Sequence, residues 1–237
     1  MTAAAIQAIG LGVTFPGGRR ALDAVNFDAP RGAVTVVVGP NGAGKTSLID
    51  AAATLLLPST GRLLVGGYDV TRRAHAVRRC IGLVPARQPG FHGRLSAREN
   101  LRFFAGLHAL PFAAAAHRIE DLACTWGLTD VLDERVDRLS DGMQTRLAIV
   151  RAAVHDPAIM LLDEPMRHLD QHWRQVFREW AIDRCRHGSR AVVLATHEPS
   201  MLDGVARVIV LRLGTVTEVI DDPDSSVLAL LASGCAA

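Results

Sequence analysis

One stretch limits the possible folds of this chain more than any other. It is residues 39–47, which read Gly-Pro-Asn-Gly-Ala-Gly-Lys-Thr-Ser. They match the phosphate-binding pattern G-x-x-x-x-G-K-[ST], whose specified positions are filled by Gly39, Gly44, Lys45 and Thr46. Small and β-branched residues 33–38 precede the loop, and apolar, helix-compatible residues 47–57 follow it. The stretch therefore predicts a strand, a phosphate-binding loop and a helix in succession.

The residue types in this loop suit a polyphosphate ligand. Glycines let successive backbone N–H groups turn towards the phosphates, and the following helix directs its positive N-terminal end at the same charge. Lys45 is the only lysine of the chain, and its compact ammonium group is expected to reach the β- and γ-phosphates. The Thr46 hydroxyl is expected to bind Mg²⁺. The phosphate-binding residues predicted from the loop are Gly39, Pro40, Asn41, Gly42, Ala43, Gly44, Lys45, Thr46 and Ser47.

Composition narrows the class of protein. A chain of 237 residues with 49% hydrophobic residues can form one large domain, or a core with a smaller lobe. No apolar run is long enough to cross a bilayer and residues 1–10 lack the basic start of a secretory signal, so we expect a cytosolic protein. The widely spaced cysteines argue against a metal cluster. A net charge of +2 argues against a nucleic-acid partner, and the clustered arginines Arg72, Arg73, Arg78 and Arg79 fit a solvated helix face.

The order of apolar segments predicts an α/β protein. Residues 6–28 are expected to form two strands at a sheet edge, joined by a turn at residues 16–18. Helical periodicity prevails over residues 95–154, with helix starts at Ser96 and Ser140, and residues 170–186 are amphipathic. Further strands are predicted at residues 62–65, 81–84, 159–162, 191–195 and 207–211. Strands that alternate with helices favour a mostly parallel sheet.

These elements predict a core with a mostly parallel sheet, an N-terminal antiparallel β subdomain and an inserted α-helical lobe. We expect the whole chain to be a single domain. Its α/β core would comprise residues 1–86 and 156–237, and the helical lobe would comprise residues 87–155.

Two adjacent carboxylates follow the apolar strand predicted at residues 159–162. The carboxyl end of a buried strand is where α/β proteins place ligand sites, so Asp163 is a candidate Mg²⁺ ligand, directly or through water. Glu164 is expected to point the other way along the strand and is a candidate general base for the water that attacks the γ-phosphate. The alternative is a pair of solvated turn carboxylates.

Two more candidate sites are weaker when each is taken alone. His197 follows the strand at residues 191–195, where an imidazole could contact the γ-phosphate or the attacking water, although a single loop histidine is usually just exposed. Ser140 is a good helix N-cap and Gly142 exposes backbone N–H groups, so this helix start could bind an anion or be an ordinary cap.

Together these residues resemble the nucleotide-binding subunit of ATP-binding cassette (ABC) transporters, which has a P-loop NTPase core. Residues 39–47 resemble its Walker A loop, residues 139–143 its signature motif, residues 159–164 its Walker B strand with the catalytic glutamate, and His197 its switch histidine. The resemblance implies that Phe15 stacks on adenine and that Leu169 and Asp170 end the D-loop, residues 166–170. It also implies ATP and Mg²⁺ as cofactors, with Lys45, Glu164 and His197 in catalysis.

Three departures from the family pattern limit what the resemblance implies. Ala86 stands where the family usually has a Mg²⁺-binding glutamine, and Gln88 follows as a possible substitute ligand. Asp141 and Met143 replace the usual glycine and glutamine of the signature, although a Gly142-Met143 ending is similar to that of many exporter subunits. Arg167 and His168 replace the small residues usual in the D-loop.

By resemblance, two such subunits, identical or different, pack head to tail, so that Ser140 and Gly142 of one close over the ATP held by the other. A membrane-spanning subunit would be the second partner, and the chain would lie at the cytoplasmic face of the membrane and drive export. Two alternatives stay open: a soluble cassette ATPase of DNA repair or translation, and a regulatory cassette that binds ATP but hydrolyses it weakly.

Overall fold

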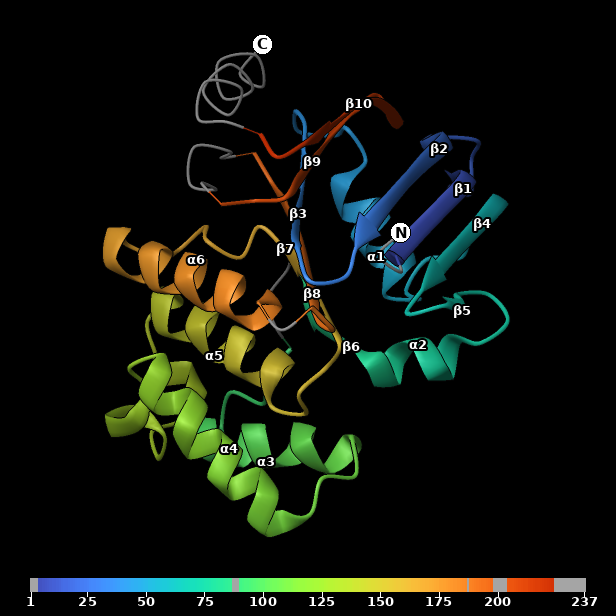
Figure 1. Ribbon diagram of the computed structural model, residues 1–237. Coiled ribbons are helices and arrows are strands. Elements are labelled where there is room, and N and C mark those ends of the chain that lie inside the picture. Colours follow the sequence, from blue (N-terminus) through green and yellow to red (C-terminus); the bar gives the residue numbers. More distant parts are fainter. Residues whose placement is uncertain (1–3, 87–89, 187, 198–203, 224–237) are drawn as a thin grey trace.

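A parallel sheet forms the centre of the molecule (Figure 1). The computed structural model describes residues 4–86, 90–186, 188–197 and 204–223. Within them the sheet has the order β10-β9-β3-β8-β7-β6, in which only β10 is antiparallel to its neighbour. In that order the strands are Thr215–Asp221, Arg207–Arg212, Val34–Val38, Ala191–Thr196, Ile159–Asp163 and Ile81–Val84. The mostly parallel α/β fold is therefore confirmed, and β10 is a strand that the sequence prediction missed.

An antiparallel sheet covers one side of this core, as predicted for the N-terminal region. Its order is β2-β1-β4-β5, with β1 at Ala4–Thr14, β2 at Arg20–Pro30, β4 at Thr60–Val65 and β5 at Tyr68–Asp69. The prediction that both N-terminal strands lie at a sheet edge is wrong for β1, which pairs with β2 on one side and β4 on the other. Two-sided pairing explains why buried residues outnumber exposed ones along β1.

Helix α1 differs from its prediction at both ends. It spans Lys45–Ala52 instead of residues 47–57. It begins earlier because Gly44, in the left-handed region with φ 106°, acts as its N-cap. It ends earlier because Thr54 has φ 64°, which breaks the helix and lets Leu55 N donate a hydrogen bond to Asp50 O.

Helices fill the chain between β6 and β7. They are α3 (Ala97–Leu107), α4 (Phe112–Thr125) and α5 (Asp141–Ala153), with 3-10 turns η1 (Thr129–Val131) and η2 (Val136–Arg138). The predicted helix starts are confirmed, because Ser96 forms a capping box with Glu99 and the Ser140 hydroxyl accepts a hydrogen bond from Met143 N. Two helices flank the sheet elsewhere: α2 (Ala74–Cys80) and α6 (Gln171–Cys185). None of the described helices is long and apolar enough to cross a membrane.

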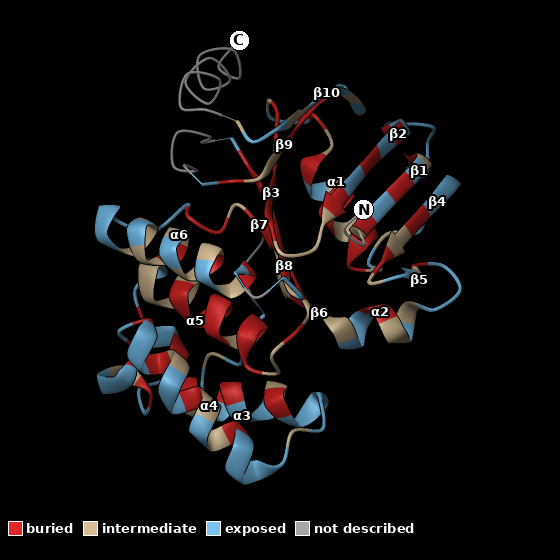
Figure 2. Cartoon of the chain, in the orientation of Figure 1, coloured by how far each residue is buried: buried red, intermediate tan, exposed pale blue. Residues whose placement is uncertain are grey.

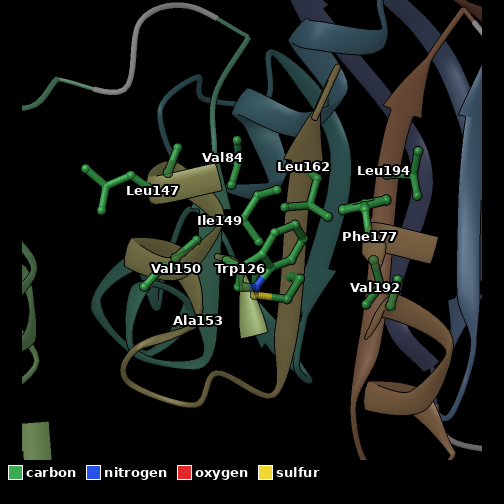
Figure 3. Close-up of a cluster of buried hydrophobic side chains, with 14 of the residues drawn as sticks. Val84, Trp126, Leu147, Ile149, Val150, Ala153, Leu162, Phe177, Val192 and Leu194 are labelled. Carbon is green, nitrogen blue, oxygen red and sulfur yellow. The ribbon is translucent and has the colours of Figure 1, made fainter. Parts of the chain in front are cut away.

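The parallel strands are buried on both faces, which is why they read as continuous apolar runs. Side chains alternate between two clusters: Val36 and Leu162 face the helices, whereas Val37 and Leu161 face α1 and the antiparallel sheet. On the helical side, Trp126 and Phe177 pack against Leu162 and its neighbours (Figure 3). Helices α3, α4 and α6 each have a buried side and an exposed side (Figure 2).

Asp156, in the loop between α5 and β7, forms ion pairs with arginines from three other segments of the chain. Its carboxylate pairs with Arg118 of α4 at 3.5 Å, with Arg184 of α6 at 3.3 Å, and with Arg190 just before β8. Arg118 also donates hydrogen bonds to the carbonyl oxygens of Val154 and Ala153 at the end of α5. This acid therefore joins the helices to the sheet.

We predict that Asp156→Asn lowers the free energy of unfolding by about 2 kcal/mol, because three arginines then lack their shared counter-charge while asparagine still tolerates the backbone φ of 53°. Urea unfolding followed by circular dichroism measures the change. The matched control is Asp183→Asn, whose exposed pair with Arg186 should contribute less than about 0.5 kcal/mol. Equal unfolding midpoints for the two variants would contradict the prediction.

Candidate active site

The phosphate-binding loop is held in shape by close backbone contacts that require glycine. A Cβ atom at Gly39 would lie 2.1 Å from the carbonyl oxygen of Leu211, and one at Gly44 would lie 2.6 Å from that of Ala21. The turn between β9 and β10 supports the loop from behind, because Gly214 N donates a hydrogen bond to Ala43 O at 2.9 Å. The loop backbone is therefore fixed between β2 and β9.

Lys45 is the first residue of α1 and is 6% exposed. Its Nζ donates hydrogen bonds to the carbonyl oxygens of Gly39 at 2.7 Å and Pro40 at 3.1 Å, so the ammonium group lies over the loop. Thr46 is the next residue of the same helix. Both side chains thus start from the positive N-terminal end of α1, where an anion is favoured.

Asp163 is the last residue of β7 and is 2% exposed. Both of its carboxylate oxygens are buried, and among the described residues neither has a hydrogen-bond partner at ordinary distance and angle. Burial raises the pKa of Asp163, while the nearby Thr46 hydroxyl and Lys45 ammonium group act to lower it. A buried carboxylate beside a threonine hydroxyl fits a hard cation such as Mg²⁺, which is commonly held by one or two carboxylates together with phosphates.

Glu164 lies just beyond β7, in the left-handed region with φ 50°. Its Oε1 is 2.9 Å from Nδ1 of His197, and its Oε2 accepts a hydrogen bond from the Thr196 hydroxyl at 3.3 Å. Its backbone N–H donates to Ala195 O at 2.9 Å, which ties it to the end of β8. The structure thus brings the predicted base and the predicted histidine together, with 19% of the Glu164 side chain and 48% of the His197 side chain exposed.

A cavity of about 370 Å³ lies between the carboxylates of Asp163 and Glu164 and the start of α5. Asp163 and Glu164 line one wall, and Asp141 and Thr145 of α5 line another. Ala86 reaches the same cavity, but its methyl group offers no ligand to a cation. The proposed substitute ligand, Gln88, lies outside the described residues.

Ser140 and Gly142 lie at the start of α5, whereas the phosphate-binding loop leads into α1. In Figure 1 the helix that follows the loop, α1, lies on one side of the parallel sheet, and α5 lies on the other. Asp141 in the first turn of α5 and Ser140 at its N-cap are exposed. The start of α5 is therefore free to meet another molecule.

Phe15 lies in the β1–β2 turn and Asp170 at the start of α6. Phe15 is half-buried at the β1–β2 turn, with the Arg19 guanidinium 4.8 Å from the centre of its ring. The Asp170 carboxylate caps α6 by accepting a hydrogen bond from Trp173 N at 3.0 Å. Within the described ranges, no group of three or more His, Cys, Asp or Glu side chains is arranged to hold a metal ion.

Sequence reasoning missed two parts of the site. The Thr196 hydroxyl, which donates to Glu164, could have been suspected because it directly precedes His197 at a strand end. Gly214, which braces the loop, gave no such signal, because its partner Ala43 is distant in the sequence and the turn follows a strand that was expected to be the last.

Comparison with known proteins identifies the family. A family profile described as "ABC transporter" matches residues 22–167. The chain is 35% identical to the ABC transporter ATP-binding protein NatA of Bacillus subtilis, over 75% of this chain and 72% of the relative. It is 38% identical to the daunorubicin resistance ATP-binding protein DrrA3 of Streptomyces coeruleorubidus, over 76% and 56%. It is 34% identical to the sulfate/thiosulfate import ATP-binding protein CysA of Mycobacterium tuberculosis, over 84% and 56%.

The fold agrees with these sequence matches. A dimeric ATP-binding cassette solved in a post-hydrolysis state with ADP and Pi superposes with a TM-score of 0.82 at 23% identity, over 92% of this chain and 99% of that one. The chain spans a little over half the length of the DrrA3 and CysA relatives. On the family profile and the NatA match, the chain belongs to the ABC transporter family, as an ATP-binding cassette of the ATPase type.

Proposed function

We propose that this chain binds and hydrolyses ATP to drive export through a separate membrane-spanning subunit, at the cytoplasmic face of the membrane. The observation that carries the proposal is the pairing of Glu164 with His197 at 2.9 Å, next to the buried carboxylate of Asp163. A regulatory cassette that binds ATP but hydrolyses it weakly has no need of a positioned base, so this geometry favours turnover.

The residues divide the chemistry between them. The Lys45 ammonium group and the backbone N–H groups of residues 39–44, except at Pro40, which has none, bind the phosphates. Thr46 and Asp163 would hold Mg²⁺. Bound Mg²⁺ would neutralise charge on the phosphate oxygens. Glu164 orients and deprotonates the attacking water, while His197, whose Nδ1 lies 2.9 Å from Oε1 of Glu164, holds the carboxylate in place.

A second cassette, identical or different, completes the site. Ser140 and Gly142 of that partner would cover the ATP held by this chain, because in one chain α1 and α5 lie on opposite sides of the sheet. Phe15 would stack on the adenine and Asp170 would lie at the cassette interface. The dimeric state of a structural neighbour supports this arrangement.

Export is the finer part of the proposal. The Gly142-Met143 ending of the signature supports it, and DrrA3 is named for drug resistance, whereas CysA is named for import. The direction of transport is therefore tested on the assembled transporter, by following its substrate in vesicles of known orientation.

Hydrolysis is tested on the purified chain, alone and with its membrane partner. We expect Mg²⁺-dependent release of phosphate that EDTA abolishes, and an ATP-dependent rise in sedimentation coefficient from monomer to dimer. Absence of phosphate release from the reconstituted complex would refute the proposed activity.

A further inference from the structure

The cavity of about 370 Å³ beside the active-site carboxylates has an unbalanced set of charges on its walls. Three carboxylates line it, those of Asp141, Asp163 and Glu164. Among the described residues that line it, Arg167 is the only arginine or lysine. Because an arginine side chain stays protonated, Arg167 is the permanent positive charge of this lining. An anion that enters the cavity therefore depends on this residue and on any bound cation.

Two of the three carboxylates have partners in the proposed site, and Asp141 does not. Asp163 would hold Mg²⁺, and Glu164 Oε1 lies 2.9 Å from Nδ1 of His197. The exposed Asp141 carboxylate forms no ion pair or hydrogen bond in the described part of the chain, although its backbone oxygen accepts a hydrogen bond from the Thr145 hydroxyl at 2.9 Å. The negative charge of Asp141 therefore acts on whatever reaches the start of α5.

Asp141 lies in the first turn of α5, directly between Ser140 and Gly142. The positive end of the helix favours a carboxylate in that turn, so Asp141 neutralises part of the charge that would otherwise attract an anion. The same position would place it beside the phosphates that Ser140 and Gly142 are proposed to cover, where two negative charges repel each other. A cation close to Asp141 would remove this penalty.

The D-loop is anchored in the core on both sides of Arg167. Met166 and Leu169 are 3% and 4% exposed and belong to the hydrophobic cluster on the helical side of the sheet. Leu169 N donates a hydrogen bond to Met166 O at 3.1 Å, which closes the turn between them. Arg167 is exposed because the turn buries its neighbours and leaves it on the outer side.

The backbone of this turn lies against the start of α5. A Cβ atom at Gly142 would lie 3.0 Å from His168 O, so the two segments are in direct contact. The Arg167 side chain forms no ion pair or hydrogen bond within the described ranges, and it lines the same cavity as Asp141. An unpaired cation and an unpaired carboxylate are thus held at one cavity by two segments that touch.

We propose that Arg167 is a further phosphate-binding residue, whose guanidinium group bridges Asp141 of its own chain and the phosphates of the ATP held by the partner cassette. The inference rests on the proposed function for the partner cassette, and it accounts for how the start of α5 accepts a polyphosphate despite Asp141. A guanidinium group suits this position because its five N–H donors form a planar fork that can bind two acidic groups at once.

ATP-driven association of the chain with its partner cassette, a second copy or a different chain, tests the proposal by sedimentation velocity. Every protein in the series carries Glu164→Gln, which slows turnover so that association is measured at equilibrium. Adding Arg167→Gln should raise the Mg²⁺-ATP concentration for half-maximal association at least about tenfold, because the Asp141 charge is then uncompensated. Adding Asp141→Asn to that variant should bring the concentration back to within about threefold of the parent, since the repulsive charge is gone.

A remote pair of the same residue types is the matched control. Arg186 and Asp183 form an exposed ion pair at 3.4 Å at the end of α6. Arg186→Gln, alone and with Asp183→Asn, makes the same changes of charge and should leave half-maximal association within about twofold of the parent. ATP binding to the dilute, monomeric chain should also stay within about twofold in every variant, because Arg167 is proposed to act on the partner's nucleotide.

Three results would overturn the proposal: an Arg167→Gln variant that associates like the parent, a loss that Asp141→Asn does not reverse, and a parent that does not associate at any ATP concentration. The second result would mean that Arg167 acts through another contact and is not the counter-charge of Asp141. Phosphate release by the wild-type complex, measured in parallel, tests the proposed function. Release without the effect of Arg167→Gln refutes this inference alone, and the expected association without release refutes the proposed activity alone.

Discussion

Replacing Glu164 with glutamine is expected to lower steady-state ATP hydrolysis at least about a hundredfold while ATP binding is retained. Glutamine has nearly the same shape and can still accept a hydrogen bond from the Thr196 hydroxyl, but it cannot take a proton from water. The hydrogen bonds from Lys45 Nζ to Gly39 O and Pro40 O do not involve Glu164, so the phosphate-binding loop should keep its shape. Phosphate release at saturating Mg²⁺-ATP and nucleotide binding at equilibrium measure the two quantities separately.

The matched control is Glu179→Gln on α6, which removes the same charge from an exposed helix position. Hydrolysis by that variant should stay within about twofold of the wild type, as expected for a surface change remote from the site. Single-turnover hydrolysis by Glu164→Gln separates chemistry from product release. If its single-turnover rate matches the wild type, Glu164 is not the base.

The parts of the site that were predictable are those in which chemistry is confined to a few adjacent residues. Few other roles require the residue types found in the loop at residues 39–47 and in the carboxylates Asp163 and Glu164. Because a buried strand precedes the loop and another precedes the carboxylates, both could be placed at one edge of the sheet. Because β3 and β8 are neighbours, as are β8 and β7, His197 at the end of β8 comes within 2.9 Å of Glu164. The sequence suggested the strands but not their order.

The unpredicted parts depend on contacts between residues that are distant in the sequence. The requirement for Gly39 comes from Leu211 O, and the requirement for Gly44 from Ala21 O, so neither follows from the loop alone. The early end of α1 depends on a left-handed Thr54, a conformation for which threonine gives no local signal. Arg78 and Arg79 were expected on a solvated helix face, but they line a cavity whose other wall comes from α3 and α5, later in the chain.

If the proposed second cassette is a second copy of this chain, Gly142→Asp should reduce hydrolysis by the homodimer at least about a hundredfold. The new carboxylate would lie where the γ-phosphate of the ATP held by the partner is proposed to bind. The site is also crowded: a Cβ atom at Gly142 would lie 3.0 Å from His168 O. Lys45→Ala should cause a comparable loss through the other half of the site. Thermal unfolding of each variant shows whether the protein is still folded.

Mixing the two inactive variants distinguishes a shared site from one contained in a single chain. In a mixed dimer, the Gly142→Asp subunit supplies an intact loop with Lys45, and the Lys45→Ala subunit supplies an intact Ser140 and Gly142, so one complete site forms. With random pairing and independent sites, an equimolar mixture should regain about a quarter of wild-type hydrolysis. A site complete within one chain predicts no recovery at any ratio. The recovered activity should also rise and fall with the fraction of mixed dimers as the ratio of the variants is changed, because neither homodimer contributes.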